Sequence, residues 1–545
     1  MASLNTRNGV LGFDNALHLL RRTTYSPTKT LVNQFALLTA AEAADTLFSN
    51  PVYSVSEPLA TDTSQKYIPT YYSPTVGSTS MNDYDRFYAV YSWWFYRAQK
   101  STTIHSKMVE FLHTIFITNN QVERYQDFTY DYMALLEFYS TRSVKTLAKK
   151  MSRLNVMHYY LDNRLNTVGA PNENYAREFL ELFTILKGPQ DGQGSYTNYT
   201  EHDVQQAARV LTGFTTILES ERLSYIDTEC KIPLGKKVFA NHDTGNKTFS
   251  SKFNNQTIQG ATNEAAMDVE LDTFIDMVFS QPTTAKNYAR RMYRYFVSRN
   301  ISTEIESDII TPLANNLIVT NYDIQSTMKM LLRSIHFYDE DDTTNGDEII
   351  GGKIKSVLEF VLVMFSQFNI EGPNQNTHTQ GFLQFYFYFL WYRSELAGQK
   401  IFMPPNVAGY PPIYEGPLYD KTWINSSNLK YRYSNFIDDL IQGITNLDAP
   451  PIIFDTVLYF RNSGNFSNPA NATVLLNEFF QLCLVETPTG DRYTYFQQAL
   501  LGNLSVINWQ NEWNNYLATN NSTSVKIALD RFIKAIVKSP EYQLI

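Results

Sequence analysis

The segment NENYAREFLELF, residues 172–183, has the residue pattern of an amphipathic helix. At about 100° per residue, Glu173, Arg177 and Glu181 fall within about 80° of one another, while Ala, Phe and Leu occupy most of the remaining arc. Asn172 stands where it can cap the helix N-terminus. One face of this helix is therefore predicted to pack against an apolar core.

The charged stripe of this helix has two interpretations. Glu173 and Arg177, like Arg177 and Glu181, are four residues apart, and such a pair stabilises an exposed helix by about 0.2–0.5 kcal/mol. On this interpretation the stripe is a solvated face whose charges neutralise one another. On the other, Glu178 and Glu181 are the carboxyl groups of an active site.

The same periodicity recurs along the chain and predicts a mainly α protein with one large multi-helix core. It is clearest in SKMVEFLHTIFI (106–117), YDYMALLEFYS (130–140), VKTLAKKMSRLNVMHYYL (144–161), AKNYARRMYRYFVSR (285–299) and IQSTMKMLLRSIHFY (324–338).

Three segments depart from this pattern. Residues 215–256 mix β-branched and aromatic residues with Gly, Asn and Asp, which predicts a small strand-rich insertion. Residues 403–425 are rich in proline, so we expect an ordered loop that holds a ligand or braces the helices. Residues 54–82 are expected to be a long surface connection. We assign the helical core to residues 1–445 and a C-terminal helical subdomain to residues 446–545.

Composition excludes several classes of protein. The chain has 545 residues and a formal net charge of -9, so nucleic acid is not expected as a partner. With only Cys230 and Cys483, it has neither a disulfide framework nor a cysteine-based zinc site. Its longest apolar runs are too short to cross a bilayer, and its first residues lack the pattern of a signal peptide.

A second charged stripe, of one sign, lies in residues 285–299. Lys286, Arg290 and Arg294 are spaced four residues apart, and like charges at this spacing repel. We expect them to face either the carboxylates of Glu173, Glu178 and Glu181 or an anionic ligand.

The loop NHDTGNKTF, residues 241–249, has the most site-like composition. His242, Asp243 and Lys247 place a base, a carboxylate and a cation around a glycine turn. The alternative is that Asp243 only stabilises the turn. His113, alone in an apolar helix, is expected to be a hydrogen-bonded core residue. The sequence contains no HExxH, GxSxG or P-loop motif, so no standard hydrolase or nucleotide enzyme is indicated.

These segments together resemble the domain-of-unknown-function 1800 family of bacterial proteins. The resemblance rests on ALHLLRRTTYSPT (16–28), KMVEFLHTIF (107–116), NENYAREFLELFT (172–184), YTEHDVQQAARVLTGF (199–214), HDTGNKTF (242–249), ARRMYRYFV (289–297), KSVLEFV (355–361), GQKIFMPPNVAGYP (398–411), TWINSSNL (422–429) and SPEYQL (539–544).

The resemblance implies family features but no reaction. It implies that the charged helix, the His242 loop and the proline-rich loop with Asn406 are shared by relatives. Where relatives have a His-x-His pair, this chain has His113 and Ile115, which weakens a two-histidine metal site. The usual Trp of the proline-rich loop is Tyr410, and Pro412 and Ile413 replace the Gly pair that follows. The ligand contacts of this loop are therefore not expected to match those of relatives.

The first of two functional hypotheses is a non-catalytic scaffold. The resemblance implies a partner of the domain-of-unknown-function 1501 family, whose members look like phosphatases or sulfatases and often carry a twin-arginine export signal. The chain would then be a subunit of an exported or cell-surface complex. By its own sequence it is expected to be soluble and cytoplasmic, with co-export to the periplasm or cell surface as the alternative.

The second hypothesis is an enzyme or binding protein for an anionic or polysaccharide substrate. Its predicted catalytic residues are Glu178, Glu181, His242 and Asp243, and its predicted ligand-binding residues are Arg177, Lys247, Arg290, Arg294, Asn406 and Trp423. This second hypothesis predicts that the helix at residue 172 and the loop at residue 242 share one cleft. No cofactor is predicted, although a divalent metal at Glu178, His242 and Asp243 is left open.

Overall fold

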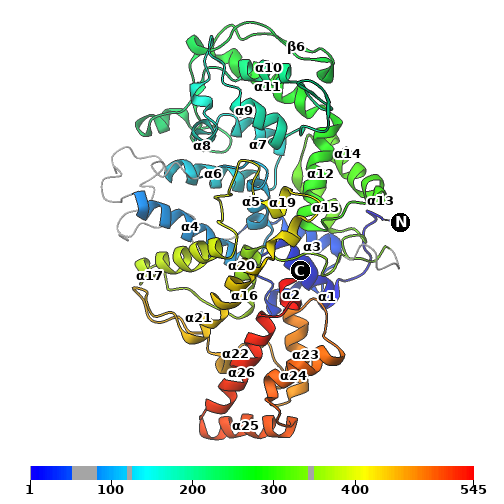
Figure 1. The fold of residues 1–545 in the computed structure, drawn as a ribbon, viewed down its shortest axis with the longest axis vertical. Coiled ribbons are helices and arrows are strands. Elements are labelled where there is room, and N and C mark those ends of the chain that lie inside the picture. The colour runs from blue at the N-terminus through cyan, green and yellow to red at the C-terminus, as the bar shows by residue number, and fades with distance from the viewer. Residues whose placement is uncertain (1, 52–82, 120–125, 342–348) are drawn as a thin grey trace.

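The segments with apolar residues three and four apart are helices, and the protein is mainly helical, as predicted (Figure 1). The computed structural model describes residues 2–51, 83–119, 126–341 and 349–545. The predicted surface connection at 54–82 therefore lies outside the described residues. Within the described part, none of the helices is both long enough and apolar enough to cross a membrane.

The N-terminal helices and the helices that follow them form the middle of the molecule (Figure 1). They are α1 (Gly12–Thr23), α2 (Lys29–Phe35), α3 (Ala40–Leu47), α4 (Asp83–Lys100), α5 (His105–His113) and α6 (Gln126–Tyr139).

The next helices form the upper end and right side of the molecule in Figure 1. They are α7 (Val144–Met151), α8 (Asn155–Tyr160), α9 (Asn174–Glu178), α10 (Glu201–Val210), α11 (Glu264–Phe279), α12 (Pro282–Phe296), α13 (Thr303–Ile305), α14 (Thr311–Val319) and α15 (Ile324–Leu332).

Small two-stranded sheets lie at this end of the molecule, in the part of the chain where the sequence predicts strands. Strand β1 (Gln190–Gly192) pairs with β2 (Ser195–Tyr196), β3 (Phe214–Thr215) with β4 (Lys236–Lys237), and β5 (Lys247–Thr248) with β6 (Thr257–Ile258), all antiparallel. The insertion predicted at 215–256 therefore coincides with the β3–β4 and β5–β6 pairs, which alternate with short 3-10 helices, while the β1–β2 pair precedes it.

The chain then returns through the middle before it forms the lower end. The returning helices are α16 (Val357–Gln367), α17 (Thr379–Gln384), α18 (Arg393–Leu396), α19 (Pro411–Tyr414), α20 (Ser426–Ser434) and α21 (Ile437–Gln442). The lower end contains α22 (Thr456–Asn462), α23 (Ala472–Cys483), α24 (Gly490–Leu501), α25 (Val506–Thr519) and α26 (Thr523–Val537).

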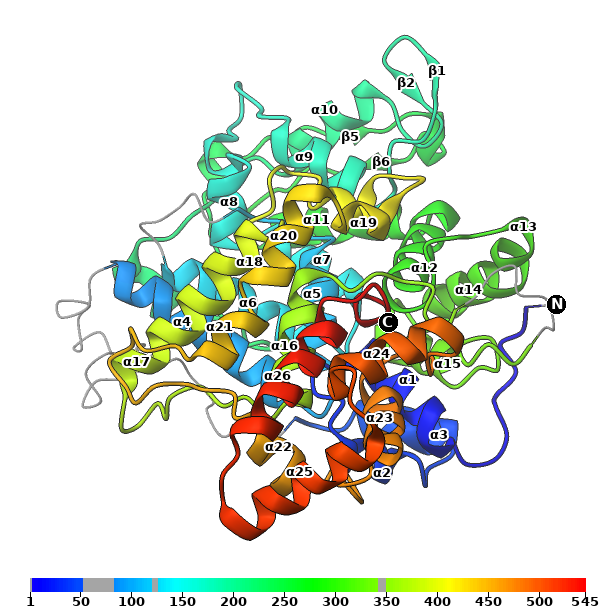
Figure 2. The ribbon, with the colours of Figure 1, turned by 60° about the horizontal axis from the view of Figure 1, so that its bottom comes forward.

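Figure 2 shows that α26 leads the chain end back from this lower part to the centre. There Lys355 donates its backbone N–H to Gln543. In the core, Phe368 stacks on Phe454, Phe479 and Tyr542, so α16 and the C-terminal helices share one apolar cluster. The boundary at residue 445 remains a prediction. Cys230 and Cys483 are both free and buried.

Candidate binding and active site

The charged stripe of residues 172–183 is paired locally. The segment folds as α9 followed by one π-helical turn, Phe179–Phe183. Arg177 lies 3.1 Å from Glu173 and 2.7 Å from Glu201 of α10. Glu181 accepts a hydrogen bond from Tyr199 at 2.9 Å and lies 3.4 Å from Lys187. The stripe thus has short-range partners, including Glu201, which the pattern alone did not identify.

Glu178 is the exception, because it has no hydrogen bond or ion pair within the described ranges. Its side chain is half-buried on α9. Burial and the adjacent carboxylate of Glu181 raise its pKa to about 7, although Arg177 and Lys187 act in the opposite direction. Glu178 is therefore a carboxyl group whose charge changes near neutral pH.

The Glu178→Gln variant is expected to be less sensitive to pH than the wild type. The folded protein retains a proton on Glu178 that the unfolded chain releases near pH 4.5, so the wild type loses stability as pH rises from about 4.5 to about 7. Above that range the variant is expected to be more stable by up to about 1 kcal/mol, because solvent screens this site. Melting temperatures at about pH 5 and about pH 8 measure the slope, with Glu173→Gln as the control. An unchanged slope in Glu178→Gln would contradict the prediction.

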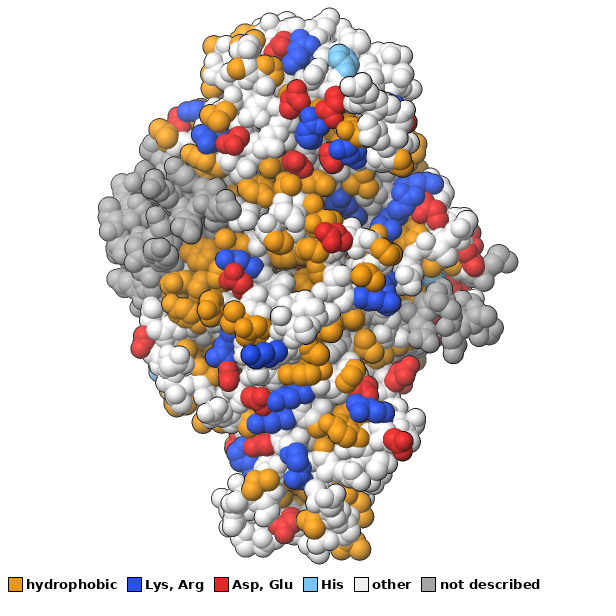
Figure 3. All heavy atoms as spheres, in the orientation of Figure 1, with side chains coloured by type: hydrophobic (Ala, Val, Ile, Leu, Met, Phe, Trp, Pro, Cys, Tyr) orange, Lys and Arg blue, Asp and Glu red, His pale blue; other side chains and the backbone are white. Residues whose placement is uncertain are grey.

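The basic stripe on α12 does not face the carboxylates of α9, so the first of the two alternatives for it is wrong. Lys286 and Arg290 lie 3.7 Å and 2.6 Å from Glu306. The π-helical turn Glu306–Ile310 packs beside α12 and brings this carboxylate over the stripe. Figure 3 shows basic side chains over α12, next to an apolar surface at the centre of the molecule. Arg294, one turn further along, lies instead over the ring of Tyr419 at 4.8 Å.

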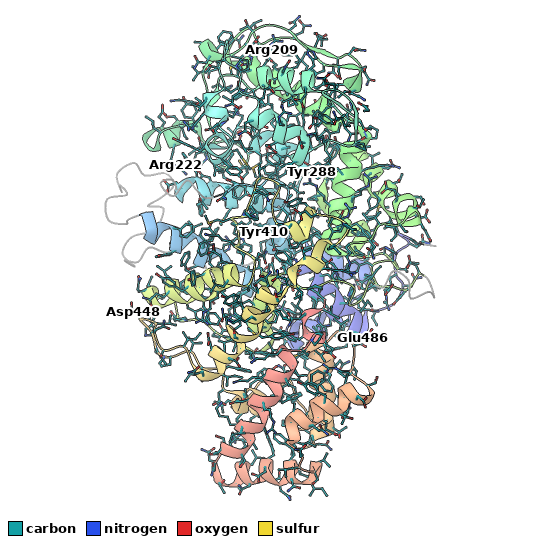
Figure 4. The ribbon with its side chains drawn as sticks, in the orientation of Figure 1. Arg209, Arg222, Tyr288, Tyr410, Asp448 and Glu486 are labelled. Carbon is teal, nitrogen blue, oxygen red and sulfur yellow. The ribbon has the colours of Figure 1, made fainter. Side chains whose placement is uncertain are left out.

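The polar side chains of the loop with His242 are paired with other groups of the protein. His242 is buried, with Nε2 3.0 Å from Glu270 and Nδ1 2.8 Å from the carbonyl oxygen of Thr212. Glu270 also lies 2.5 Å from the amine of Lys247. Asp243 pairs with Arg209 of α10, which Figure 4 labels at the top of the molecule.

The structure does not bring the residues of the optional metal site into the central cavity or into a metal-binding group. None of Glu178, His242 and Asp243 lines the central cavity described below. No group of three or more His, Cys, Asp or Glu side chains within the described part of the chain could hold a metal ion.

His113 is a core histidine, as expected, and its Nδ1 lies 2.7 Å from the hydroxyl of Tyr132. Burial lowers its pKa to about 3. Asn406 shapes the proline-rich loop, since its side chain donates to the Tyr414 hydroxyl and accepts from the Ala408 N–H.

A cavity of about 270 Å³ lies where distant parts of the chain meet. Its wall is formed by α5, the end of the helical segment after α9, α12, residues 353–359 and the proline-rich loop. Tyr410, which Figure 4 labels at the centre of the molecule, belongs to this loop. Of the predicted ligand-binding residues, the cavity brings Arg294 and Trp423 together.

A buried acid, Glu110, occupies one part of the cavity wall. It accepts hydrogen bonds from the hydroxyls of Tyr25 and Tyr295 and, at 3.2 Å, from the amide of Gln399. Burial is the main cause of its raised pKa. The charge of Lys107 and the hydrogen bonds from Tyr25 and Tyr295 act in the opposite direction. Glu110 is therefore an acid with a raised pKa in the cavity wall, where it faces a molecule that enters.

The other two carboxylates of the wall are neutralised by cations. Glu359 pairs with Lys107, whose side chain is fully buried, and it also accepts the backbone N–H of Ser356. Asp420 lies 2.8 Å from Arg299.

Three cations of the wall have no such partner. Arg291 donates to the carbonyl oxygen of Leu182 and to the side chain of Asn287. Lys353 donates to the carbonyl oxygen of Tyr295. Arg294 has neither a hydrogen bond nor an ion pair with any residue that the structure describes, and its Nε is buried. The cavity therefore carries a local excess of positive charge in a protein whose formal net charge is -9.

The pattern of the sequence did not reveal Glu110, Lys353 or Glu359 as site residues. For the two glutamates the available signal was a single charged residue among apolar helix residues, as in MVEFL and SVLEFV. Such a residue is either buried with a partner or part of a site, and only its neighbours in space distinguish the two cases.

Comparison with known proteins gives one match. A family model described as "Protein of unknown function (DUF1800)" covers residues 18–544. No curated protein and no solved structure matches the chain.

Proposed function

The chain belongs to the DUF1800 family, whose function is unknown, and we propose that it binds a small anionic molecule in its central cavity. The observation that carries this proposal is the side chain of Arg294. It lines the cavity, and no described carboxylate pairs with it. A partly buried guanidinium without a counter-charge is energetically costly, and an anionic ligand would remove that cost.

The surroundings of Arg294 support an organic anion. Arg291 and Lys353 add positive charge, while Tyr414, Tyr419 and Trp423 add aromatic surface. A ligand site typically combines an apolar wall with a few polar groups that orient the ligand. A volume of about 270 Å³ suits a metabolite-sized molecule.

On this proposal, the enzyme hypothesis assigns the role of proton donor to a different carboxyl group. Glu110 lines the cavity beside Tyr295, whereas Glu178 does not line it. We assign proton donation to Glu110 and anion binding to Arg294, with Trp423 as an apolar contact.

The Arg294→Gln variant is expected to bind anions at least about tenfold more weakly than the wild type. Removing a charge-assisted hydrogen bond costs about 1.5–3 kcal/mol, and about 1.4 kcal/mol corresponds to a tenfold change in affinity. Calorimetric titration with pyruvate, citrate, glucuronate and glucose 6-phosphate measures the loss. The matched control is Arg290→Gln, one turn earlier on α12, where the arginine pairs with Glu306.

Two results would contradict the proposal. One is that none of these anions binds the wild type. The other is that the two variants lose affinity equally, since that would indicate a general effect of surface charge.

A second candidate function is the scaffold of an exported or cell-surface complex. The observation that favours it is the internal pairing of the family's charged segments, such as Arg177 with Glu201 and Lys247 with Glu270. We propose a protein of the domain-of-unknown-function 1501 family as the partner. Purification from the native host, followed by mass spectrometry of associated proteins, tests this candidate, and a protein that purifies alone would contradict it.

A further inference from the structure

Lys353 differs from the other buried lysines in the part of the chain that the structure describes. Its side chain is buried, and it lines the central cavity. Its amine donates to the carbonyl oxygen of Tyr295 and lies 5.4 Å from the centre of that ring. Among the described residues, no carboxylate lies within ion-pair distance of it.

The comparison with three other buried lysines shows which features are specific to Lys353. Lys107 pairs with Glu359, and Lys247 pairs with Glu270. Lys355 has no carboxylate partner, but its amine lies 4.0 Å from the centre of the Tyr542 ring and it does not line the cavity. Lys353 alone among these four combines a buried, unpaired amine with a place in the cavity wall.

Burial makes the amine of Lys353 a nucleophile. Removal from water disfavours the ammonium form, and the pKa falls to about 8, although Glu359 and Asp420 partly oppose this effect. A fraction of the amine is therefore uncharged near neutral pH, and only an uncharged amine attacks a carbonyl group.

Tyr295 contacts both this amine and an acid. The Tyr295 carbonyl oxygen accepts from Lys353, and its hydroxyl donates to Glu110 at 2.5 Å. Arg294 precedes Tyr295 on α12 and also lines the cavity. A nucleophile, an acid with a raised pKa and an anion-binding group thus line one cavity.

We propose that Lys353 is a catalytic residue that forms an imine with the carbonyl group of a small oxo acid whose carboxylate binds Arg294. This proposal rests on the proposed function, because Arg294 must first hold the anion. The Lys353 nitrogen forms a bond to the carbonyl carbon, and the amine proton moves to the oxygen to give a carbinolamine. Glu110 then donates its proton to the hydroxyl group, which leaves as water. The products are a protonated imine and the carboxylate of Glu110, so atoms and charge balance.

The test is reductive trapping on the full-length protein. The protein is incubated with pyruvate and cyanoborohydride, digested, and the modified lysines are mapped by mass spectrometry. We expect an adduct on Lys353 and none on Lys355, which lies two residues away and serves as an internal control. Acetone, which has the carbonyl group but no carboxylate, is expected to give no adduct at Lys353.

Variants connect the adduct to the site. We expect Lys353→Met to abolish the adduct, Arg294→Gln to reduce it at least about tenfold, and Arg290→Gln to leave it unchanged. The mapping on the wild type decides the question even if a variant fails to fold.

The outcomes separate this inference from the proposed function. Adducts spread over exposed lysines, or equal labelling with acetone, would overturn the assignment of Lys353. If pyruvate binds the wild type and Arg294→Gln abolishes that binding, but no adduct forms, the imine is wrong and the anion site stands. If none of the tested anions binds and no adduct forms, both proposals fail.

Discussion

The Glu359→Ala variant is expected to lose about 3–5 kcal/mol of its free energy of unfolding, because it leaves the buried amine of Lys107 without a counter-charge. The exposed fraction of the side chain is 0% for Lys107 and 9% for Glu359. Glu359 also caps α16, since it accepts the backbone N–H of Ser356. The substitution therefore removes an ion pair and a helix cap together.

The pKa of Glu359 supports this expectation. Burial would raise it, but the charges of Lys107 and Lys353 and the hydrogen bonds from Lys107 and Ser356 lower it from 4.5 to about 2. Because the folded-state pKa is depressed, this contribution to stability is present above pH 4.5 and is lost as pH falls towards about 2.

Urea denaturation of the wild type and the variant at neutral pH measures the effect. The matched control is Glu371→Ala, which removes the exposed pair with Lys100 and is expected to cost less than about 1 kcal/mol. The double variant Lys107→Met with Glu359→Leu is expected to recover much of the loss, because an apolar pair leaves no buried charge. A loss below about 1 kcal/mol in Glu359→Ala would contradict the prediction.

The Glu270→Gln variant is also expected to lose about 3–5 kcal/mol, for a related reason. The Glu270 carboxylate contacts His242, Lys247 and the backbone N–H of Ala261, and its side chain is 1% exposed. Glutamine preserves the size of the side chain but removes the charge, so the fully buried ammonium group of Lys247 loses its partner.

Thermal and urea unfolding of this variant also bear on the predicted catalytic role of His242. Asp191→Asn is the control, because it weakens a more exposed pair with Lys252 at the same end of the molecule and is expected to cost less than about 1 kcal/mol. If Glu270→Gln unfolds like the wild type, the buried cluster does not serve stability, and the catalytic prediction for His242 and Asp243 gains support.

The sequence distance between paired residues explains why part of the candidate site could not be predicted. Lys107 and Glu359 are 252 residues apart in the chain, and Glu110 and Gln399 are 289 apart. A local pattern reveals that a charge is isolated in an apolar helix, but it does not reveal which distant residue neutralises it. The expectation that α12 faces the carboxylates of α9 was wrong for this reason, since Glu306 is the partner of Lys286 and Arg290.

Arg294 and Trp423 could be predicted as ligand-binding residues because their neighbours in the sequence form an unusual pattern. Arg294 ends a stripe of like charges, which favours an opposite charge nearby. Trp423 follows a proline-rich segment that cannot form a continuous helix. Both signals come from residues within a few turns of chain.

The sequence by itself determined the helical character of this protein and most of its buried faces, because burial repeats with the period of the helix. The family resemblance likewise needed only the order of the motifs, and the match over residues 18–544 confirms it. Only the tertiary structure decided which charges are neutralised and which remain unpaired, because ion pairing depends on distances between segments that are remote in the chain. That distinction separates the closed cluster of His242, Lys247 and Glu270 from the cavity where Arg294 and Lys353 have no carboxylate partner among the described residues.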